Sequence, residues 1–145
     1  MRTVVQRVSR ASVSVGGEVV GAIEQGLMVL VGFTNGDDQE KIDWVTRKII
    51  GLRIFDDEDG RMNRSLVDVG GKILVVSQFT LYADTKKGNR PSYMAAAEPV
   101  LAEKLYDMFC RRLKAMDVPI DTGLFGARMS VELCNEGPVT IMVDR

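Results

Sequence analysis

Two aliphatic hydroxyl groups and a carboxamide are crowded into the segment Ser77-Gln78-Phe79-Thr80-Leu81-Tyr82. The apolar run Ile73–Val76 precedes it, so these polar groups lie where a buried strand emerges from the core. Binding and catalytic side chains often occupy such a position, and the first four residues of the segment are therefore candidates for a catalytic role. The alternative is a strand end whose hydroxyls only satisfy neighbouring backbone groups.

A Gly-Pro dipeptide, Gly137-Pro138, lies within the segment Asn135–Thr140 near the end of the chain. Proline lacks a backbone N–H, and X–Pro bonds are the ones that can be cis, at roughly 5–6% in folded proteins. The alternative here is a hairpin connection between two strands, because Gly-Pro marks turns generally.

Three cations, Lys86, Lys87 and Arg90, gather in the segment Thr85–Tyr93, which has no apolar periodicity. An exposed loop is therefore predicted. Lys and Arg beside flexible backbone can bind phosphates, which fix the position of a nucleic acid rather than read its sequence. The alternative is an ordinary solvated loop.

The chain contains no histidine, which excludes several routes to hydrolysis. Ser-His-Asp and Cys-His catalysis both need an imidazole as general base. Zinc sites built on histidine are excluded too, and Cys110 and Cys134 cannot form a four-thiolate site. Hydrolysis must therefore rest on backbone electrostatics, hydroxyls, carboxylates or the substrate itself, with no metal or cofactor. The acidic run Asp56–Gly60 is predicted to be a turn, since a calcium loop would place Phe55 and Leu66 at ligand positions.

Antiparallel strands are predicted in the first third of the chain. Val13 and Val15 alternate with polar residues, Gly16-Gly17 forms a two-residue turn, and Glu18-Val19-Val20 returns. The continuous apolar run Leu27–Val31 is typical of a strand buried on both faces.

Two helices are predicted. The first has Asp37 as its N-cap and Glu40 in capping-box spacing, and its apolar residues recur at helical spacing as far as Leu52. The second runs from about Pro99 to about Met116 and carries one apolar stripe.

The remaining patterns predict further strands. A second tight hairpin over Val67–Val76 leads into a core strand, and two closing strands are expected around Met129–Leu133 and Val139–Val143. Together the elements predict a single α+β domain, residues 1–145, with a mainly antiparallel, strongly curved, barrel-like β-sheet packed by two helices.

The composition is that of an ordinary globular protein, with 46% hydrophobic and 27% charged residues in 145. No apolar run approaches the ~20 residues of a membrane span, and the opening residues are too polar for a secretory signal. Two cysteines are too few for a disulfide framework, which favours a reducing cytoplasm. A net charge of −1 argues against a protein that coats nucleic acid non-specifically, although a local basic patch can still hold one end of an RNA.

The three polar segments, taken together, resemble the motifs of the D-aminoacyl-tRNA deacylase (D-tyrosyl-tRNA(Tyr) deacylase) family. The resemblance covers essentially the whole chain and rests on Met1–Val8, Ser77–Leu81, Lys86–Ser92 and Asn135–Thr140. Gly137 indicates the bacterial type of this deacylase.

The resemblance implies a cytoplasmic homodimer that hydrolyses the ester between a D-amino acid and the terminal adenosine of tRNA, with no membrane or DNA partner. Gly137-Pro138 of each subunit resembles a cis dipeptide that enters the partner's site. There its carbonyls would reject an L-substituent by steric hindrance and tolerate glycine, which has none. Arg7 is a candidate to brace the dipeptide, because a guanidinium donates in a fixed fork. Phe125 and Met129 resemble the remaining positions of the family's pocket.

The amides of Phe79 and Thr80 are the candidates for an oxyanion hole, and water attack assisted by the 2′-hydroxyl of the substrate is the expected chemistry. A covalent role for Thr80 is disfavoured because no histidine activates its hydroxyl. Two other functions stay open: a non-catalytic RNA-binding or interaction module of the same fold, and a generic serine or threonine esterase, which the missing base disfavours.

Overall fold

One long strand, β1 (Arg2–Val15), organises the sheet in this computed structural model, which describes residues 1–145. Along one edge β1 pairs antiparallel with β2 (Glu18–Ile23) and β3 (Gly26–Gly32). Along the other edge it pairs antiparallel with β8 (Ser130–Asp144). The predicted turn at Gly16-Gly17 is confirmed, with both glycines at positive φ.

The rest of the sheet is parallel. β3 pairs in parallel with β6 (Lys72–Ser77), and β6 pairs in parallel with β7 (Ile120–Thr122). Parallel neighbours need a crossover connection, and here the helices α1 (Gln39–Gly51) and α2 (Pro99–Lys114) lie within the two crossovers. The predicted α+β class with two helices is confirmed, and these two strand pairs make the sheet mixed.

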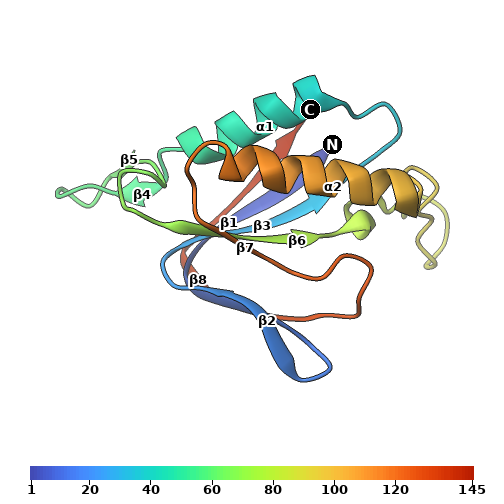
Figure 1. The fold of residues 1–145 in the computed structure, drawn as a ribbon, viewed down its shortest axis with the longest axis horizontal. Helices are drawn as coiled ribbons and strands as arrows, with labels where there is room; N and C mark the ends of the chain where they lie inside the picture. The colour runs from blue at the N-terminus through green and yellow to red at the C-terminus, as the bar shows by residue number, and fades with distance from the viewer.

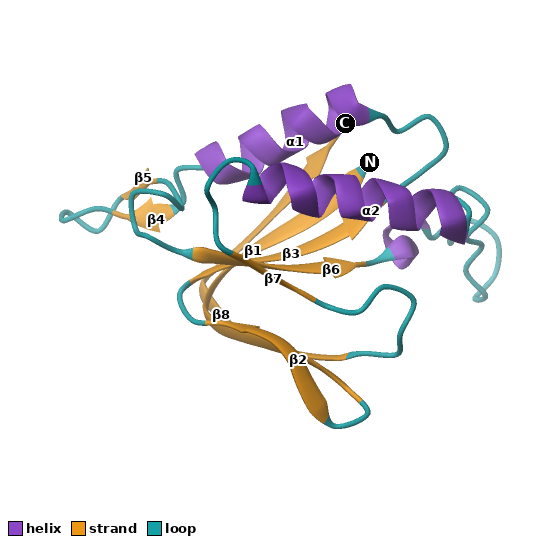
Figure 2. Cartoon of the chain, in the orientation of Figure 1, coloured by secondary structure: helices purple, strands orange, loops and turns teal.

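Both helices cover one face of the sheet, while β2 and part of β8 curl under the other face (Figures 1 and 2). Alternate residues of the buried strand β3 serve two cores. Leu27, Val29 and Val31 pack in the core beneath the helices, whereas Met28 packs in the smaller core inside the curl. The sheet nearly closes there. A hydrogen bond joins β2 to the strand Ile120–Thr122 at the other end of the sheet, in which the Ala22 amide donates to the Asp121 carboxylate at 2.9 Å. The expected barrel-like curvature is therefore present.

The prediction for the start of α1 was wrong by one residue. Asp38 is the N-cap, and its side chain accepts a hydrogen bond from the Lys41 amide. Asp37 is buried instead, where its carboxylate accepts from the Thr34 amide at 2.8 Å and from the N-terminal ammonium of Met1 at 2.6 Å. Asp37 and Asp38 can both act as an N-cap, so contacts with the rest of the fold decide which of them does.

The predicted hairpin over Val67–Val76 does not form. The side chain of Asp68 accepts hydrogen bonds from the amide and the hydroxyl of Ser65, which folds this stretch into a local turn. The Gly71 amide donates to the Leu66 carbonyl at 3.0 Å, and the chain then enters β6 directly. The acidic segment after Phe55 is a turn, as predicted, and it joins two short strands, β4 (Phe55–Asp56) and β5 (Met62–Arg64).

The two predicted closing strands are one continuous strand, β8. It pairs with β1 from Ser130 to Asp144, and the register shifts opposite Arg7 and Ser9. Gly137-Pro138 therefore lies in an irregular stretch within one strand, and the hairpin alternative is wrong. Neither helix of the structure is of the length and apolarity that a membrane crossing requires.

Candidate functional site

Strand β6 ends at Ser77, and the chain turns at once into a short 3-10 helix, η1 (Phe79–Tyr82). The Gln78 amide still donates to the Val31 carbonyl at 2.7 Å, and the turn then closes through a bond from the Leu81 amide to the Gln78 carbonyl at 3.2 Å. The first amides of a helix have no carbonyl ahead of them. Accordingly, the amides of Phe79 and Thr80 donate to no other group of the chain.

A cavity of about 550 Å³ opens beside these two free amides. Five of the residues that the sequence singled out line it together: Ser77, Gln78, Phe79, Phe125 and Met129. They come from the end of β6, from η1 and from the segment that leads into β8, so the fold joins positions about fifty residues apart. Cavities that bind small ligands are typically about 300–1,000 Å³ and mostly apolar.

Thr80 lies next to this cavity without lining it. The carboxamide nitrogen of Gln78 donates to the Thr80 hydroxyl oxygen, which fixes that side chain against its neighbour. The carbonyl of Leu81, one residue further on, accepts a hydrogen bond from Arg2 at 2.9 Å. The same guanidinium lies 4.7 Å from the centre of the Tyr82 ring. Burial raises the pKa of Tyr82 to about 12, so its phenol stays neutral. Gln78 thus holds η1 near its start, and Arg2 holds it near its end.

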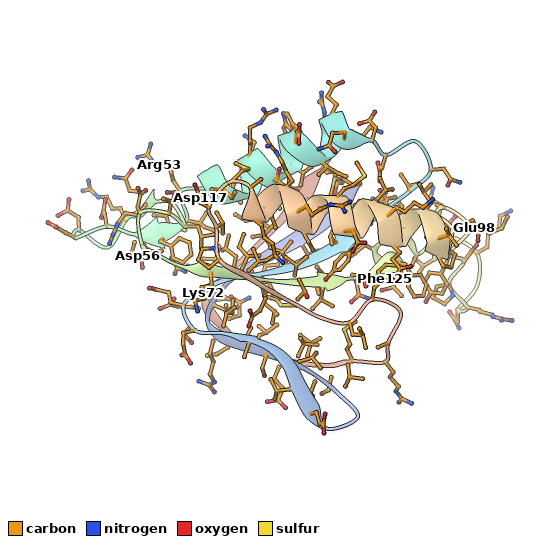
Figure 3. The ribbon with its side chains drawn as sticks, viewed as in Figure 1. Arg53, Asp56, Lys72, Glu98, Asp117 and Phe125 are labelled. Atoms are coloured by element: carbon orange, nitrogen blue, oxygen red, sulfur yellow. The ribbon has the colours of Figure 1, made fainter.

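One wall of the cavity was not predicted from the sequence. The residues at the start of α2 form it. Small residues, Ala96, Ala97 and Ala102, line this side together with Glu98, the only charged residue of the lining. Figure 3 shows Glu98 and Phe125 at the same end of the molecule. The alanine-rich run before Pro99 was the available signal, because small side chains leave room where a helix begins against a sheet.

Gly32, at the end of β3, lets η1 approach the sheet. A Cβ atom at this position would lie 2.7 Å from the Gln78 carbonyl oxygen and 3.3 Å from the Cβ of Leu81. Real Cβ atoms essentially never come so close to a backbone oxygen. The position of the two free amides therefore depends on a glycine that no motif of the sequence singled out.

The cationic segment is an exposed loop, as predicted, and it begins and ends beside the cavity. Lys86, Lys87 and Arg90 are exposed, and a two-way backbone bridge between Asp84 and Ser92 closes the loop at its base. Tyr93 follows at once and lines the cavity with Phe79. The three cations consequently lie near the cavity mouth without lining it.

Arg7 and Gly137-Pro138 lie at the opposite end of the molecule. Arg7 pairs with Leu27 at the start of β3, whereas Ser77 pairs with Val31 near its end. Four residues of extended strand separate the two levels by roughly 13 Å. Figure 3 shows Asp56, the ion-pair partner of Arg7, at the far end from Phe125. Within one chain the predicted site residues therefore form two separate groups, one at the cavity and the other around Arg7 and Gly137-Pro138.

Arg7 contacts the segment that contains Gly137. The buried guanidinium donates to the Glu136 carbonyl at 3.1 Å, to the Ile54 carbonyl at 2.7 Å and to Asp56 at 3.1 Å. Gly137 has φ +123°, and a Cβ there would lie 2.8 Å from Val139 and 3.1 Å from Arg7. The position consequently requires glycine. The Gly137–Pro138 bond is cis, as predicted, and both residues are exposed.

Comparison with known sequences finds one family over nearly the full chain. The family model described as "D-Tyr-tRNA(Tyr) deacylase" matches residues 4–144. A protein of Thermomicrobium roseum named D-aminoacyl-tRNA deacylase is 56% identical over 144 residues, which is 99% of this chain and 94% of that protein. A protein of Brevibacillus brevis with the same name is 55% identical over 99% of both chains.

Solved structures share the fold. The structure described as "c-Myc DNA Unwinding Element Binding Protein" has a TM-score of 0.94 at 43% identity and covers 100% of this chain and 99% of its own. A second structure, of "a probable eukaryotic D-amino acid tRNA deacylase", has a TM-score of 0.84 over 99% of this chain and 98% of its own. At 20% identity the second likeness concerns the fold alone.

Proposed function

The chain belongs to the D-Tyr-tRNA(Tyr) deacylase family, and on that premise we propose that it hydrolyses D-aminoacyl-tRNA to free D-amino acid and tRNA. The observation that supports this most is the cavity in which Ser77, Gln78 and Phe79 meet Phe125 and Met129 beside two free amides. Its volume suits an aminoacylated adenosine. The two free cysteines and the tRNA substrate agree with a cytoplasmic enzyme.

The proposed chemistry uses backbone donors and the substrate. Water attacks the ester carbonyl, and the negative charge that develops on its oxygen is stabilised by the amides of Phe79 and Thr80. The 2′-hydroxyl of the terminal ribose assists the attack, and the departing 3′-oxygen takes up a proton as the C–O bond breaks. Positioning of an already activated ester can supply much of the acceleration. Glu98 is the one carboxylate of the cavity that offers an alternative base.

We infer a two-fold homodimer, because the Gly137 segment can complete a cavity only in a second copy. The segment is exposed, is braced by Arg7, and lies about 13 Å along the sheet from the level of Ser77. An isologous contact places it in the partner's cavity twice and builds two equivalent sites. The free edge of β8, which pairs with β1 alone, lies on this side.

Backbone carbonyls at Gly137-Pro138 would then form the wall that selects chirality. A wall without side chains rejects an L-substituent by steric hindrance and leaves a D-substituent directed outwards. Selection of this kind is strict for chirality and loose for side-chain identity. Glycine has no substituent to reject, so mischarged glycyl-tRNA is also a proposed substrate.

The direct test is hydrolysis of matched D-aminoacyl-, L-aminoacyl- and glycyl-tRNA by the same enzyme preparation. We expect fast release of the D-amino acid and glycine, with the L-ester left near its spontaneous rate. Binding of tRNA without hydrolysis would favour a non-catalytic RNA-binding or interaction module. Equal hydrolysis of the D- and L-esters would favour a generic esterase.

The cations Lys86, Lys87 and Arg90 are proposed to bind phosphates near the acceptor end. Each change to Ala should weaken tRNA binding and lower the slope of log K against log salt by about 0.7–0.9 for every phosphate that the variant no longer neutralises. The D/L ratio should stay the same, because the loop lies outside the cavity lining. Binding measured at several salt concentrations checks this. A changed ratio with unchanged affinity would place the cations beside the amino acid instead.

Gly32→Ala should lower kcat/KM by about tenfold, because the new methyl group pushes η1 away from the sheet. The turn must withdraw by several tenths of an ångström, and a misplacement of about 1 Å can cost on the order of 10²-fold. Gly51→Ala is the matched control, since nothing lies within 4 Å of a Cβ at that exposed position. Unchanged kinetics in a folded Gly32→Ala enzyme would show that the position of η1 is not critical.

A further inference from the structure

Two aromatic side chains at the rim of the cavity have no role in the chemistry proposed above. The rings of Phe79 and Tyr93 meet edge to face, with centroids 5.1 Å apart and planes inclined by 71°. Phe79 is 56% exposed and Tyr93 39% exposed, although both belong to the cavity lining. Each ring therefore has one part against the cavity and another part free on the surface.

We propose that this aromatic pair, Phe79 and Tyr93, is a stacking surface for the base of the penultimate nucleotide of tRNA, the nucleotide that precedes the terminal adenosine. The inference rests on the proposed function and adds a second nucleotide to the same site. Unpaired RNA bases are commonly bound by stacking on exposed aromatic rings, and each base so stacked contributes about 1–3 kcal/mol.

The path of the substrate favours this position. With the terminal adenosine inside the cavity, the RNA strand must leave across the rim. The cationic loop returns to the fold at Tyr93, so the phosphates on either side of the penultimate nucleotide can meet Lys86, Lys87 or Arg90 while its base meets the rings. Aromatic rings beside cations are the combination that binds single-stranded nucleic acid.

The backbone around Tyr93 is fixed before any ligand arrives. The Ser92 amide donates to the Asp84 carbonyl at 2.9 Å, and the Ala96 amide donates to the Tyr93 carbonyl at 3.0 Å. The Tyr93 hydroxyl, in contrast, makes no hydrogen bond within the chain, whereas its ring packs edge to face against Phe79. A stacking role needs the ring and not the hydroxyl. Tyr93→Phe should therefore preserve stacking, and Tyr93→Leu should remove it.

The experiment pairs protein variants with an altered substrate. D-Aminoacyl-tRNA is prepared with either a normal or an abasic penultimate nucleotide, and kcat/KM is measured for the wild type, Tyr93→Phe and Tyr93→Leu. The abasic change should cost the wild type and Tyr93→Phe roughly 5- to 150-fold, which corresponds to about 1–3 kcal/mol at 1.36 kcal/mol per tenfold. For Tyr93→Leu the same change should cost less than about threefold. Met94→Ala, at a neighbouring side chain that is 92% exposed, should behave as the wild type.

Several results would overturn the proposal. An abasic penalty that is equal in the wild type and Tyr93→Leu would show that the ring does not meet this base. An equal loss by Tyr93→Leu on D-aminoacyl-adenosine, which lacks the nucleotide, would make Tyr93 a part of the cavity wall only. A shift of Tyr93→Leu from dimer to monomer in sedimentation would assign the ring to a contact between subunits. Absence of hydrolysis of every substrate by the wild type would instead refute the proposed function itself.

Discussion

Thr80→Pro should remove most of the deacylase activity, whereas Thr80→Ala should retain much of it. Proline deletes the Thr80 amide, which donates to no group of the chain and is a proposed donor to the oxyanion. Loss of one such donor typically lowers kcat by about 10²–10³-fold. The hydroxyl of Thr80 accepts from the Gln78 side chain and has no imidazole to activate it, so its removal costs only positioning. Single-turnover hydrolysis of D-aminoacyl-tRNA compares the two variants.

Circular dichroism and sedimentation must first show that Thr80→Pro folds and associates as the wild type does, because proline can distort η1. A well-folded Thr80→Ala enzyme without activity, or an amino acid trapped on Thr80, would establish covalent catalysis. Loss of activity in Glu98→Gln as large as in Thr80→Pro would identify the carboxylate as the base, against attack assisted by the 2′-hydroxyl.

Mixing two nearly inactive variants should restore activity if each site takes its parts from both subunits. Gly137→Val places a β-branched residue at φ +123° and crowds Val139 and Arg7, so the proposed wall should move and the new side chain should obstruct the partner's cavity for either substrate. Thr80→Pro damages the proposed donor instead. A mixed dimer holds both defects in one site and leaves the other site intact. Random exchange makes about half of the dimers mixed, so about a quarter of wild-type activity should return.

Native mass spectrometry establishes that mixed dimers have formed, and the initial rate of D-aminoacyl-tRNA hydrolysis is then measured. The same exchange of Thr80→Pro with itself serves as the control and should restore nothing. Mixed dimers without activity would show that Gly137 and Thr80 act within one subunit, whereas full activity of Gly137→Val alone would show that Gly137 has no part in the site.

Local chemistry explains which parts of the site could be predicted. Polar residues directly after the apolar run Ile73–Val76 identified the strand end, and their position at its exit is confirmed. Three cations without apolar periodicity identified the exposed loop. In both segments the side chains differ from what packing alone requires, so the signal was in the residues themselves.

Other features were not predicted, either because a local contact competed with the expected strand or because the deciding partner is distant in the sequence. Val67–Val69 alternates as a strand would, yet Ser65 and Asp68 capture the backbone in a turn. Asp37 and Asp38 are equally good caps, and the contacts of Asp37 with Met1 and with the Thr34 amide decide between them. Arg7 and Thr80 both belong to segments that match the family's motifs. Nothing in their spacing along the sequence indicates that the fold places them at opposite ends of the molecule.

The pairing of β1 with β8 determines when the protein can finish folding. The ribosome makes β1 (Arg2–Val15) long before its neighbour β8 (Ser130–Asp144), so one edge of β1 stays without a partner until β8 has been made. Contacts of such long sequence separation fold slowly, and an unpaired edge invites association with other chains. Arg7 also reaches Glu136 only in this final step. Because Met129 of the cavity lining directly precedes β8, we expect the cavity and the Gly137 segment to be completed together when β8 pairs with β1, and the nascent chain to depend on chaperones until then.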